Sequence, residues 1–253
     1  MGEQYAARLV DLYDADNPDG PDHDYYRELA ARHAANSILD LRCGTGILTV
    51  TFAGPGRRVT GVDPSAAMLG YARRRLGAQA VRWVHGDSRL LPEGPYDLMV
   101  MTGNVAQHIA DPQWQRTLSD LRARAAAGAV LAFESRNPTA RAWETWGQEV
   151  PEIRHTPHGP LAERCTVTEQ GHGRVLLRFD NHFLATGERI GQETLLTFRD
   201  RSTLARQLHA AGFKVSAVWG TWRRTPFRGH EPIMVFEARA WDSATTHLRR
   251  HLS

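Results

Sequence analysis

Short apolar runs alternate with amphipathic or alanine-rich segments along the first two thirds of the chain. The apolar runs cover residues 37–41, 58–63, 81–84, 96–102 and 129–134, and we expect each of them to form a strand. The segments between them predict helices over residues 47–53, 65–76 and 112–127, with Ser65 as the N-cap of the second. Continuous apolar strands separated by helices are typical of a parallel sheet that is covered on both faces.

The pattern changes after residue 163. Residues 164–170, 174–184 and 188–200 are rich in β-forming residues. Leu177, Phe179 and Phe183 fall on nearly every second position, which predicts an antiparallel strand with one covered face. A helix over residues 201–211 and strands over 214–219 and 233–240 are expected to follow. The chain therefore reads as an α/β core that is interrupted by an antiparallel insertion.

We expect four parts along the chain. Residues 1–36 form an N-terminal helical cap, residues 37–163 the first part of the core, residues 164–200 the insertion, and residues 201–253 the C-terminal part of the core. No apolar run approaches the roughly 18 residues that a membrane span requires, and the polar, acidic N-terminal segment has neither a signal-peptide nor a transit-peptide pattern. These features predict a cytoplasmic protein with no membrane partner.

Charge and cysteine content bear on three further questions: a nucleic-acid partner, the redox state of the compartment and a metal site. The net charge is +3, but the basic residues are scattered and their densest cluster, residues 73–75, falls on an expected surface helix, so we expect no nucleic-acid partner. Two cysteines without a CxxC pair suit a reducing compartment. His155, His158 and Cys165 lack a fourth ligand, and we therefore expect no metal site.

Three features at the ends of successive strands carry the candidate chemistry. The first strand runs into Gly44 and Gly46, and a strand that leads through a glycine turn into a helix lets the backbone approach a ligand closely. Asp63 ends the second strand, where a carboxylate can accept both hydroxyls of a ribose. Asp87 follows the third strand, where it can accept a hydrogen bond from an adenine amino group. Together these positions predict a site for an adenosine-containing ligand.

The glycine pattern and a missing lysine argue against two classes of adenosine-containing ligand, the dinucleotides and ATP. The third glycine of a dinucleotide fingerprint is missing, and no phosphate-binding-loop lysine occurs. Residues 38–46 (ILDLRCGTG) resemble the first motif of class I S-adenosylmethionine (SAM) dependent methyltransferases, and residues 61–69 (GVDPSAAML) resemble the second. Residues 85–88 (HGDS) and 96–98 (YDL) are similar to the two motifs that follow. The resemblance covers residues 37–134 and is strongest to the small-molecule branch of the family.

This resemblance implies a fold, a cofactor and a set of site residues. The fold would be a Rossmann-like, mostly parallel seven-stranded sheet with helices on both faces, with the insertion covering the substrate side. The cofactor would be SAM: the glycine loop would pass under its methionine part, Asp63 would bind its ribose, and the residues after the third and fourth strands would contact its adenine and its sulfonium side. The implied cofactor-binding residues are Asp40, Arg42, Cys43, Gly44, Gly46, Asp63, Pro64, Met68, Asp87, Ser88, Thr102 and Asn104.

Arg42 departs from the family pattern, because it replaces the first motif glycine. Its side chain could crowd the methionine part, pair with the methionine carboxylate, or point away. On the acceptor side, His108 follows the fourth strand and is the candidate general base. The segment around Tyr13, Tyr25 and Tyr26 is expected to fold over SAM, while Trp143, Trp146, Trp222 and Phe227 are candidates for an aromatic pocket wall.

The leading interpretation is a SAM-dependent methyltransferase that acts on an oxygen or nitrogen atom of a small-molecule acceptor. Two alternatives stay open. A peptide N-terminal methyltransferase would need a groove for its substrate, and a catalytically silent SAM-binding protein would account for Arg42 at the glycine position.

Overall fold

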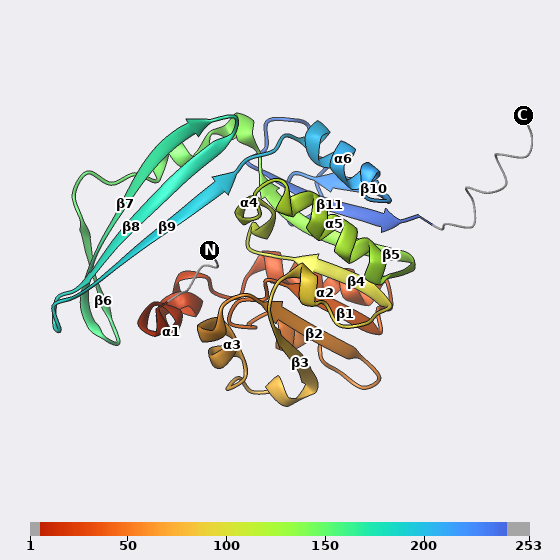
Figure 1. Cartoon of the computed structure of the whole chain (residues 1–253), viewed down its shortest axis with the longest axis horizontal. Helices are drawn as coiled ribbons and strands as arrows, with labels where there is room; N and C mark the ends of the chain where they lie inside the picture. The colour runs from red at the N-terminus through yellow and green to blue at the C-terminus, as the bar shows by residue number, and fades with distance from the viewer. Residues whose placement is uncertain (1–5, 242–253) are drawn as a thin grey trace, which may run out of the picture.

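The computed structural model describes residues 6–241 and contains two β-sheets (Figure 1). The main sheet has seven strands in the order β10-β11-β5-β4-β1-β2-β3. All neighbouring strands pair in parallel except β11, which is antiparallel to both β5 and β10. The strands are β1 (Ser37–Leu41), β2 (Arg58–Asp63), β3 (Val81–His85), β4 (Tyr96–Met101), β5 (Ala125–Arg136), β10 (Phe213–Trp219) and β11 (Ile233–Ala240).

Both faces of the main sheet are covered. Successive residues of its inner strands point to opposite sides, and the apolar residues on each side pack against a separate layer. Leu39 and Met99 face a core layer to which helices α5 and α6 contribute, whereas Ile38 and Leu98 face a layer to which α2 contributes. The helices are α1 (Ala7–Asp16), α2 (Pro21–Arg32), α3 (Ala66–Ala72), α4 (Val105–His108), α5 (Gln113–Arg124) and α6 (Arg201–Ala210), with short 3₁₀ turns at Thr49–Phe52, Ala78–Ala80, Ser88–Leu90, Pro138–Ala140 and Ala142–Thr145. Among the helices of residues 6–241, none combines the length and apolar character that a membrane crossing requires.

Three predicted helices are shorter than expected. The helix predicted over residues 112–127 ends at Arg124, because residues 125–127 belong to β5. The segment predicted as a helix over residues 47–53 forms only the 3₁₀ turn Thr49–Phe52. Four of the seven residues are β-branched and disfavour an α-helix: Ile47, Thr49, Val50 and Thr51. Helix α3 begins as predicted after Ser65, whose hydroxyl accepts a hydrogen bond from the Met68 backbone N–H. It ends at Ala72 and not near residue 76.

The second sheet is antiparallel and has the order β6-β7-β8-β9. Its strands are β6 (Glu152–Thr156), β7 (Gly159–Gly171), β8 (Arg174–Phe183) and β9 (Glu188–Thr197). It therefore begins before residue 164, where we expected the insertion to start. β6 escaped the sequence analysis because it is a short edge strand with one large apolar residue, Ile153, and that residue is exposed. The two sheets together confirm the predicted fold class.

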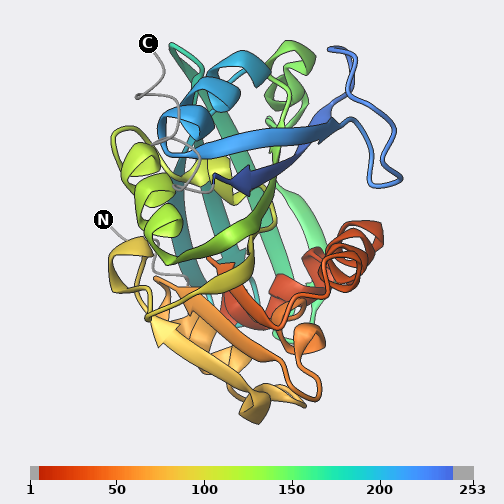
Figure 2. The same ribbon diagram turned by 90° about the vertical axis from the view of Figure 1, so that its right-hand side faces the viewer.

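Helix α1 lies between the second sheet and the main domain (Figures 1 and 2). Its Leu9 and Leu12 pack with Leu161 and Phe183 of the second sheet. Three ion pairs reinforce this contact, and they join Arg8 to Glu188, Asp16 to Arg154, and Asp11 to His158 when that histidine is protonated. On its other side, Asp14 pairs with Arg75 and accepts a hydrogen bond from the Thr45 hydroxyl at 2.6 Å. α1 is thus attached to both parts of the molecule.

Candidate functional site

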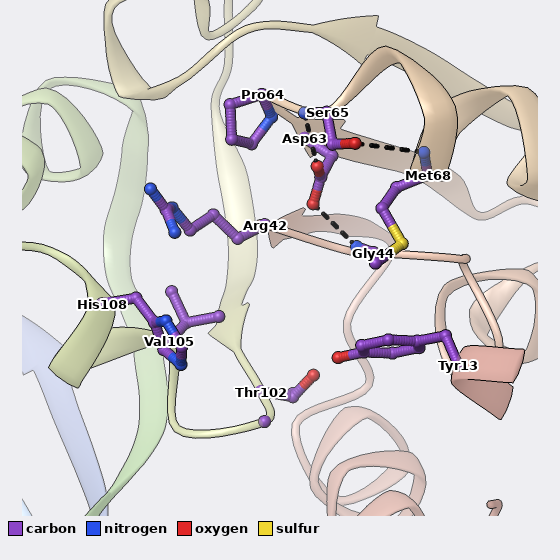
Figure 3. Close-up of a pocket in the computed structure, with 11 residues that line it drawn as sticks. Tyr13, Arg42, Gly44, Asp63, Pro64, Ser65, Met68, Thr102, Val105 and His108 are labelled. Atoms are coloured by element: carbon purple, nitrogen blue, oxygen red, sulfur yellow. Dashed lines mark hydrogen bonds between the residues drawn. The ribbon is translucent and has the colours of Figure 1, made fainter. Parts of the chain in front are cut away.

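Asp63 lies at the carboxyl end of β2, and its carboxylate is held by two backbone N–H groups. Gly44 donates a hydrogen bond to Oδ2 at 2.9 Å, and Ser65 donates one to Oδ1 at 2.8 Å. The side chain is buried but borders a pocket (Figure 3). Because both donors are backbone groups at strand ends, the fold itself fixes where this carboxylate points.

The pocket collects residues from α1 and from the segments that follow β1, β2 and β4. It encloses about 500 Å³ of space, part of which is open to solvent. Figure 3 shows Asp63 and Met68 on one side and Tyr13, Thr102 and His108 on the other. Its lining residues are Tyr13, Arg42, Gly44, Asp63, Pro64, Ser65, Met68, Thr102, Gly103, Val105 and His108. Most of these are residues that the sequence singled out.

A second, adjoining pocket holds the features predicted after the third strand. Arg42, Pro64 and His108 line both pockets, and Asp87 and Ser88 line the second. Asp87 accepts hydrogen bonds from the Arg89 backbone and guanidinium, which lower the pKa of this carboxyl below its usual value. A third pocket, which shares Tyr13 and Gly44 with the first, includes Cys43. The three pockets form one groove along the carboxyl edge of the sheet.

Arg42 adopts a left-handed backbone conformation, with φ at +61°. Glycine reaches this region at little cost, whereas a residue with a side chain is disfavoured there. The turn after β1 therefore keeps the shape that suits a glycine although an arginine occupies the position. Figure 3 shows the side chain extending into the groove toward Pro64 and His108 and away from Tyr13. Arg42 therefore lies among the lining residues of both adjoining pockets.

Gly46 does not line these pockets, and its missing side chain serves packing. A Cβ at Gly46 would lie 2.5 Å from Cη2 of Trp83, and one at Gly61 would lie 2.6 Å from Cζ3 of the same ring. Both glycines therefore make room for the indole on β3. Only Gly44 brings its backbone to the pocket, as predicted for the loop.

Two other predicted cofactor residues also lie outside the pocket lining. Asp40 is buried in β1, where its Oδ2 accepts a hydrogen bond from the Thr49 hydroxyl at 2.6 Å. Burial raises the pKa of Asp40 to about 7. Asn104 supports the site through its backbone, since its N–H donates to Glu134 Oε1 at 2.6 Å. Thr102 and Gly103, immediately before it, line the pocket.

Glu134 anchors the loop after β4 to the N-terminal cap. It is buried at the carboxyl end of β5, and its second oxygen accepts a hydrogen bond from the Tyr26 hydroxyl of α2. Burial raises the pKa of Glu134, and burial together with the carboxylate raises the pKa of Tyr26 well above its usual value. Tyr25 makes a parallel contact, because its hydroxyl donates to Glu237 at 2.7 Å. Tyr26 therefore supports the loop after β4 through Glu134, and neither tyrosine is among the lining residues of the three pockets.

Four lining residues of the first pocket belonged neither to the predicted cofactor set nor to the predicted catalytic position: Tyr13, Ser65, Gly103 and Val105. From the sequence, Tyr13 was only part of a segment expected to fold over SAM. The residues around it in the chain do not indicate that its ring reaches the groove. Trp143 and Trp146 instead belong to an aromatic cluster with Phe198 under the second sheet. Trp222 packs on Tyr25 and Tyr26.

Comparisons with known proteins agree with this geometry. The methyltransferase-domain family matches residues 38–128. Malonyl-[acyl-carrier protein] O-methyltransferase of Pectobacterium atrosepticum is 30% identical over 54% of this chain, and the chain spans about half the length (55%) of that relative. Cypemycin N-terminal methyltransferase of a Streptomyces species is 24% identical over 79% of this chain and 82% of its own.

A solved structure shows the same fold over nearly the whole chain. The SAM-dependent methyltransferase from Clostridium acetobutylicum aligns with 93% of this chain and 98% of its own, with a TM-score of 0.78 and 14% identity. Residues 38–128 therefore match the methyltransferase-domain family, and the likeness to the solved structure shows the fold of the chain as a whole.

Proposed function

We propose that this protein transfers a methyl group from SAM to an oxygen or nitrogen atom of a small-molecule acceptor. The observation that carries the proposal is the Asp63 carboxylate, which is fixed by Gly44 and Ser65 at the centre of a groove along the carboxyl edge of the sheet. In open α/β sheets, ligands bind in this position, outside the carboxyl ends of the strands.

The residues of the groove fit an adenosyl group. Asp63 provides acceptor oxygens for ribose hydroxyls, and Pro64 and the nearly buried Met68 provide apolar surface beside it. A Cβ at Gly103 would meet no heavy atom within 4 Å, so the loop there leaves space for a ligand. Asp87 in the adjoining pocket provides an acceptor for an adenine amino group. Bound SAM would supply an electrophilic methyl group on a sulfonium, whose leaving group is a neutral thioether.

The chain's own residues would mainly position and desolvate the reactants. Such positioning can supply most of the rate enhancement in a displacement of this kind. His108 lines both main pockets and would accept the proton of an acceptor that starts protonated. The second sheet would cover the acceptor.

Calorimetric titration with SAM and S-adenosylhomocysteine tests cofactor binding, and transfer of labelled methyl groups into extracted metabolites tests turnover. We expect binding of both ligands and label in a small-molecule fraction. Binding without any transfer would support the silent SAM-binding alternative, which the arginine at position 42 motivates. No binding would reject the proposal.

A peptide N-terminal methyltransferase is the second candidate. It is supported by the similarity to cypemycin N-terminal methyltransferase, which extends over 79% of this chain. The two candidates differ in where the label goes, because a peptide substrate would carry it on its terminal amine. Exchange of the second sheet with that of a relative of different specificity should change the acceptor while leaving SAM affinity nearly unchanged.

A further inference from the structure

Arg136 and Gln107 form a polar pair beside the groove that the proposed function does not use. Arg136 ends β5 and is partly exposed, whereas Gln107 lies in α4 and is fully buried. Oε1 of Gln107 accepts hydrogen bonds from the Arg136 backbone N–H at 3.2 Å and from its Nη1 at 3.4 Å. The other end of the amide, Nε2, is buried and has no hydrogen-bond partner within residues 6–241.

The charge of Arg136 is poorly compensated by its neighbours. Its guanidinium carbon lies 4.9 Å from the centroid of the Trp146 ring, and no carboxylate within residues 6–241 lies within 4.0 Å of it. Burial lowers the pKa of Arg136, although attraction to Glu134 opposes the shift. The two oxygens of Glu134 are already engaged by Tyr26 and by the Asn104 backbone.

The buried Arg199 shows how this fold can compensate the charge of an arginine. The Arg199 guanidinium donates to the carbonyls of Ala106 and Ile109 at 2.8 and 2.6 Å and also contacts Asp111. Its role is therefore to hold both ends of α4. Arg136 has five N–H donors as well, but its one side-chain hydrogen bond to the described residues is the 3.4 Å contact with Gln107.

The pair lies next to elements that border the groove, and neither residue is itself among the lining residues. Trp146, on which Arg136 rests, packs on Phe198 beneath the second sheet. Gln107 immediately precedes His108, which lines the groove. Glu134 contacts the loop after β4, and Arg136 is two residues further along the same strand, an advance of about 7 Å. The backbone of Arg136 therefore lies about 7 Å along β5 from the residue that holds the loop after β4.

We propose that Arg136, together with Nε2 of Gln107, binds an oxyanion group of the methyl acceptor. The planar guanidinium fork matches a carboxylate or a phosphate, and an anion would also give the buried amide the acceptor it lacks. This inference rests on the proposed function and narrows it to acceptors that carry a negative charge.

The test uses the full chain saturated with S-adenosylhomocysteine and titrates inorganic phosphate and malonate by calorimetry at constant ionic strength. We expect saturable binding of at least one anion and no binding of malonamide, the neutral analogue of malonate. The anion that binds more tightly identifies whether the anionic group of the acceptor is a phosphate or a carboxylate. Arg136→Ala should weaken that binding about tenfold or more. Arg178→Ala is the matched control, because Arg178 is an exposed arginine of the second sheet that pairs with Glu193, and it should change nothing.

A second variant keeps the test decisive if Arg136→Ala does not fold. Gln107→Glu places a carboxylate against Arg136 and should abolish anion binding. Equal anion affinity in the wild type and the variants, or no saturable binding to the wild type, would overturn the inference. So would a tenfold loss of S-adenosylhomocysteine affinity in Arg136→Ala, because Arg136 would then serve the cofactor. Failure of the wild type to bind S-adenosylhomocysteine would instead reject the proposed function, and the anion titration without it would still test Arg136.

Discussion

The backbone N–H of Gly44 donates a hydrogen bond to Oδ2 of Asp63 at 2.9 Å, so the loop after β1 orients the carboxylate at the end of β2. The two strands are neighbours in the main sheet and pair in parallel. A change at either residue therefore affects both the loop and the carboxylate.

Asp63→Ala should weaken SAM binding about ten- to a hundredfold. Hydrogen bonds to a charged group contribute about 1.5–3 kcal/mol, and this change removes the acceptor proposed for the ribose hydroxyls. Calorimetric titration of S-adenosylhomocysteine measures the effect. Asp180→Ala, at an exposed position of the second sheet, is the control and should leave the dissociation constant unchanged. An unchanged constant in Asp63→Ala would remove Asp63 from the cofactor site.

Arg42→Gly should tighten S-adenosylhomocysteine binding about fivefold, which corresponds to roughly 1 kcal/mol. The side chain extends into the groove, and glycine would keep the left-handed turn while vacating that space. Arg42→Lys retains a long cation and should bind like the wild type. Weaker binding by Arg42→Gly would mean that the guanidinium pairs with the ligand.

His108→Asn should lower the rate of methyl transfer about a hundredfold or more if this histidine is the general base. S-adenosylhomocysteine affinity should stay within about threefold of the wild type, because the proposed role concerns the acceptor. Single-turnover transfer of labelled methyl groups measures the rate. A variant with the wild-type rate and pH profile would show that no proton passes through His108.

Asp40→Asn should remove part of the pH dependence of stability. Burial raises the pKa of Asp40 to about 7 in the folded state, above its usual value of 3.8, so the folded chain binds more protons between these values. Wild-type stability therefore falls as the pH rises from about 4 to 7. The variant should match the wild type below pH 4 and gain up to about 4 kcal/mol above pH 7. Denaturant unfolding across this range measures the difference, and a constant offset at every pH would contradict the assignment.

Tyr26→Phe should destabilise the fold by about 1–3 kcal/mol, because it leaves the buried Glu134 without one of its donors. The loop after β4 should also become less ordered, since Glu134 accepts the Asn104 N–H. Urea unfolding and amide exchange of residues 102–104 measure the two effects. Tyr71→Phe, at a partly exposed tyrosine of α3, is the control, and an equal change there would argue against the role of Glu134.

The sequence was sufficient to predict the sheet and the position of Asp63 at its carboxyl edge, because both depend on patterns that are local in the chain. The bounds of β1, β2 and β11 agree with their apolar runs, and Asp63 lies where the end of such a run places it. The functions of Gly46 and Asp40 could not be predicted in this way. Whether a motif glycine faces a ligand or an indole depends on Trp83, which belongs to another strand.

Residues that meet across the fold were also beyond the sequence analysis. Tyr13 reaches the groove because α1 packs against the second sheet, whose first strand carries a weak pattern. Gln107 and Arg136 lie in separate elements, and the hydrogen bond between them shows only in three dimensions. In each case the missing information is tertiary packing.

The ion pairs that attach α1 to the second sheet also have a kinetic consequence. Tyr13 of α1 lines the groove, so we expect this helix to slow the exchange of a bound cofactor. Two of these pairs, Arg8 with Glu188 and Asp16 with Arg154, are partly exposed and are therefore screened by salt. Dissolved salt should thus accelerate cofactor release, and the residence time of S-adenosylhomocysteine should shorten as ionic strength rises.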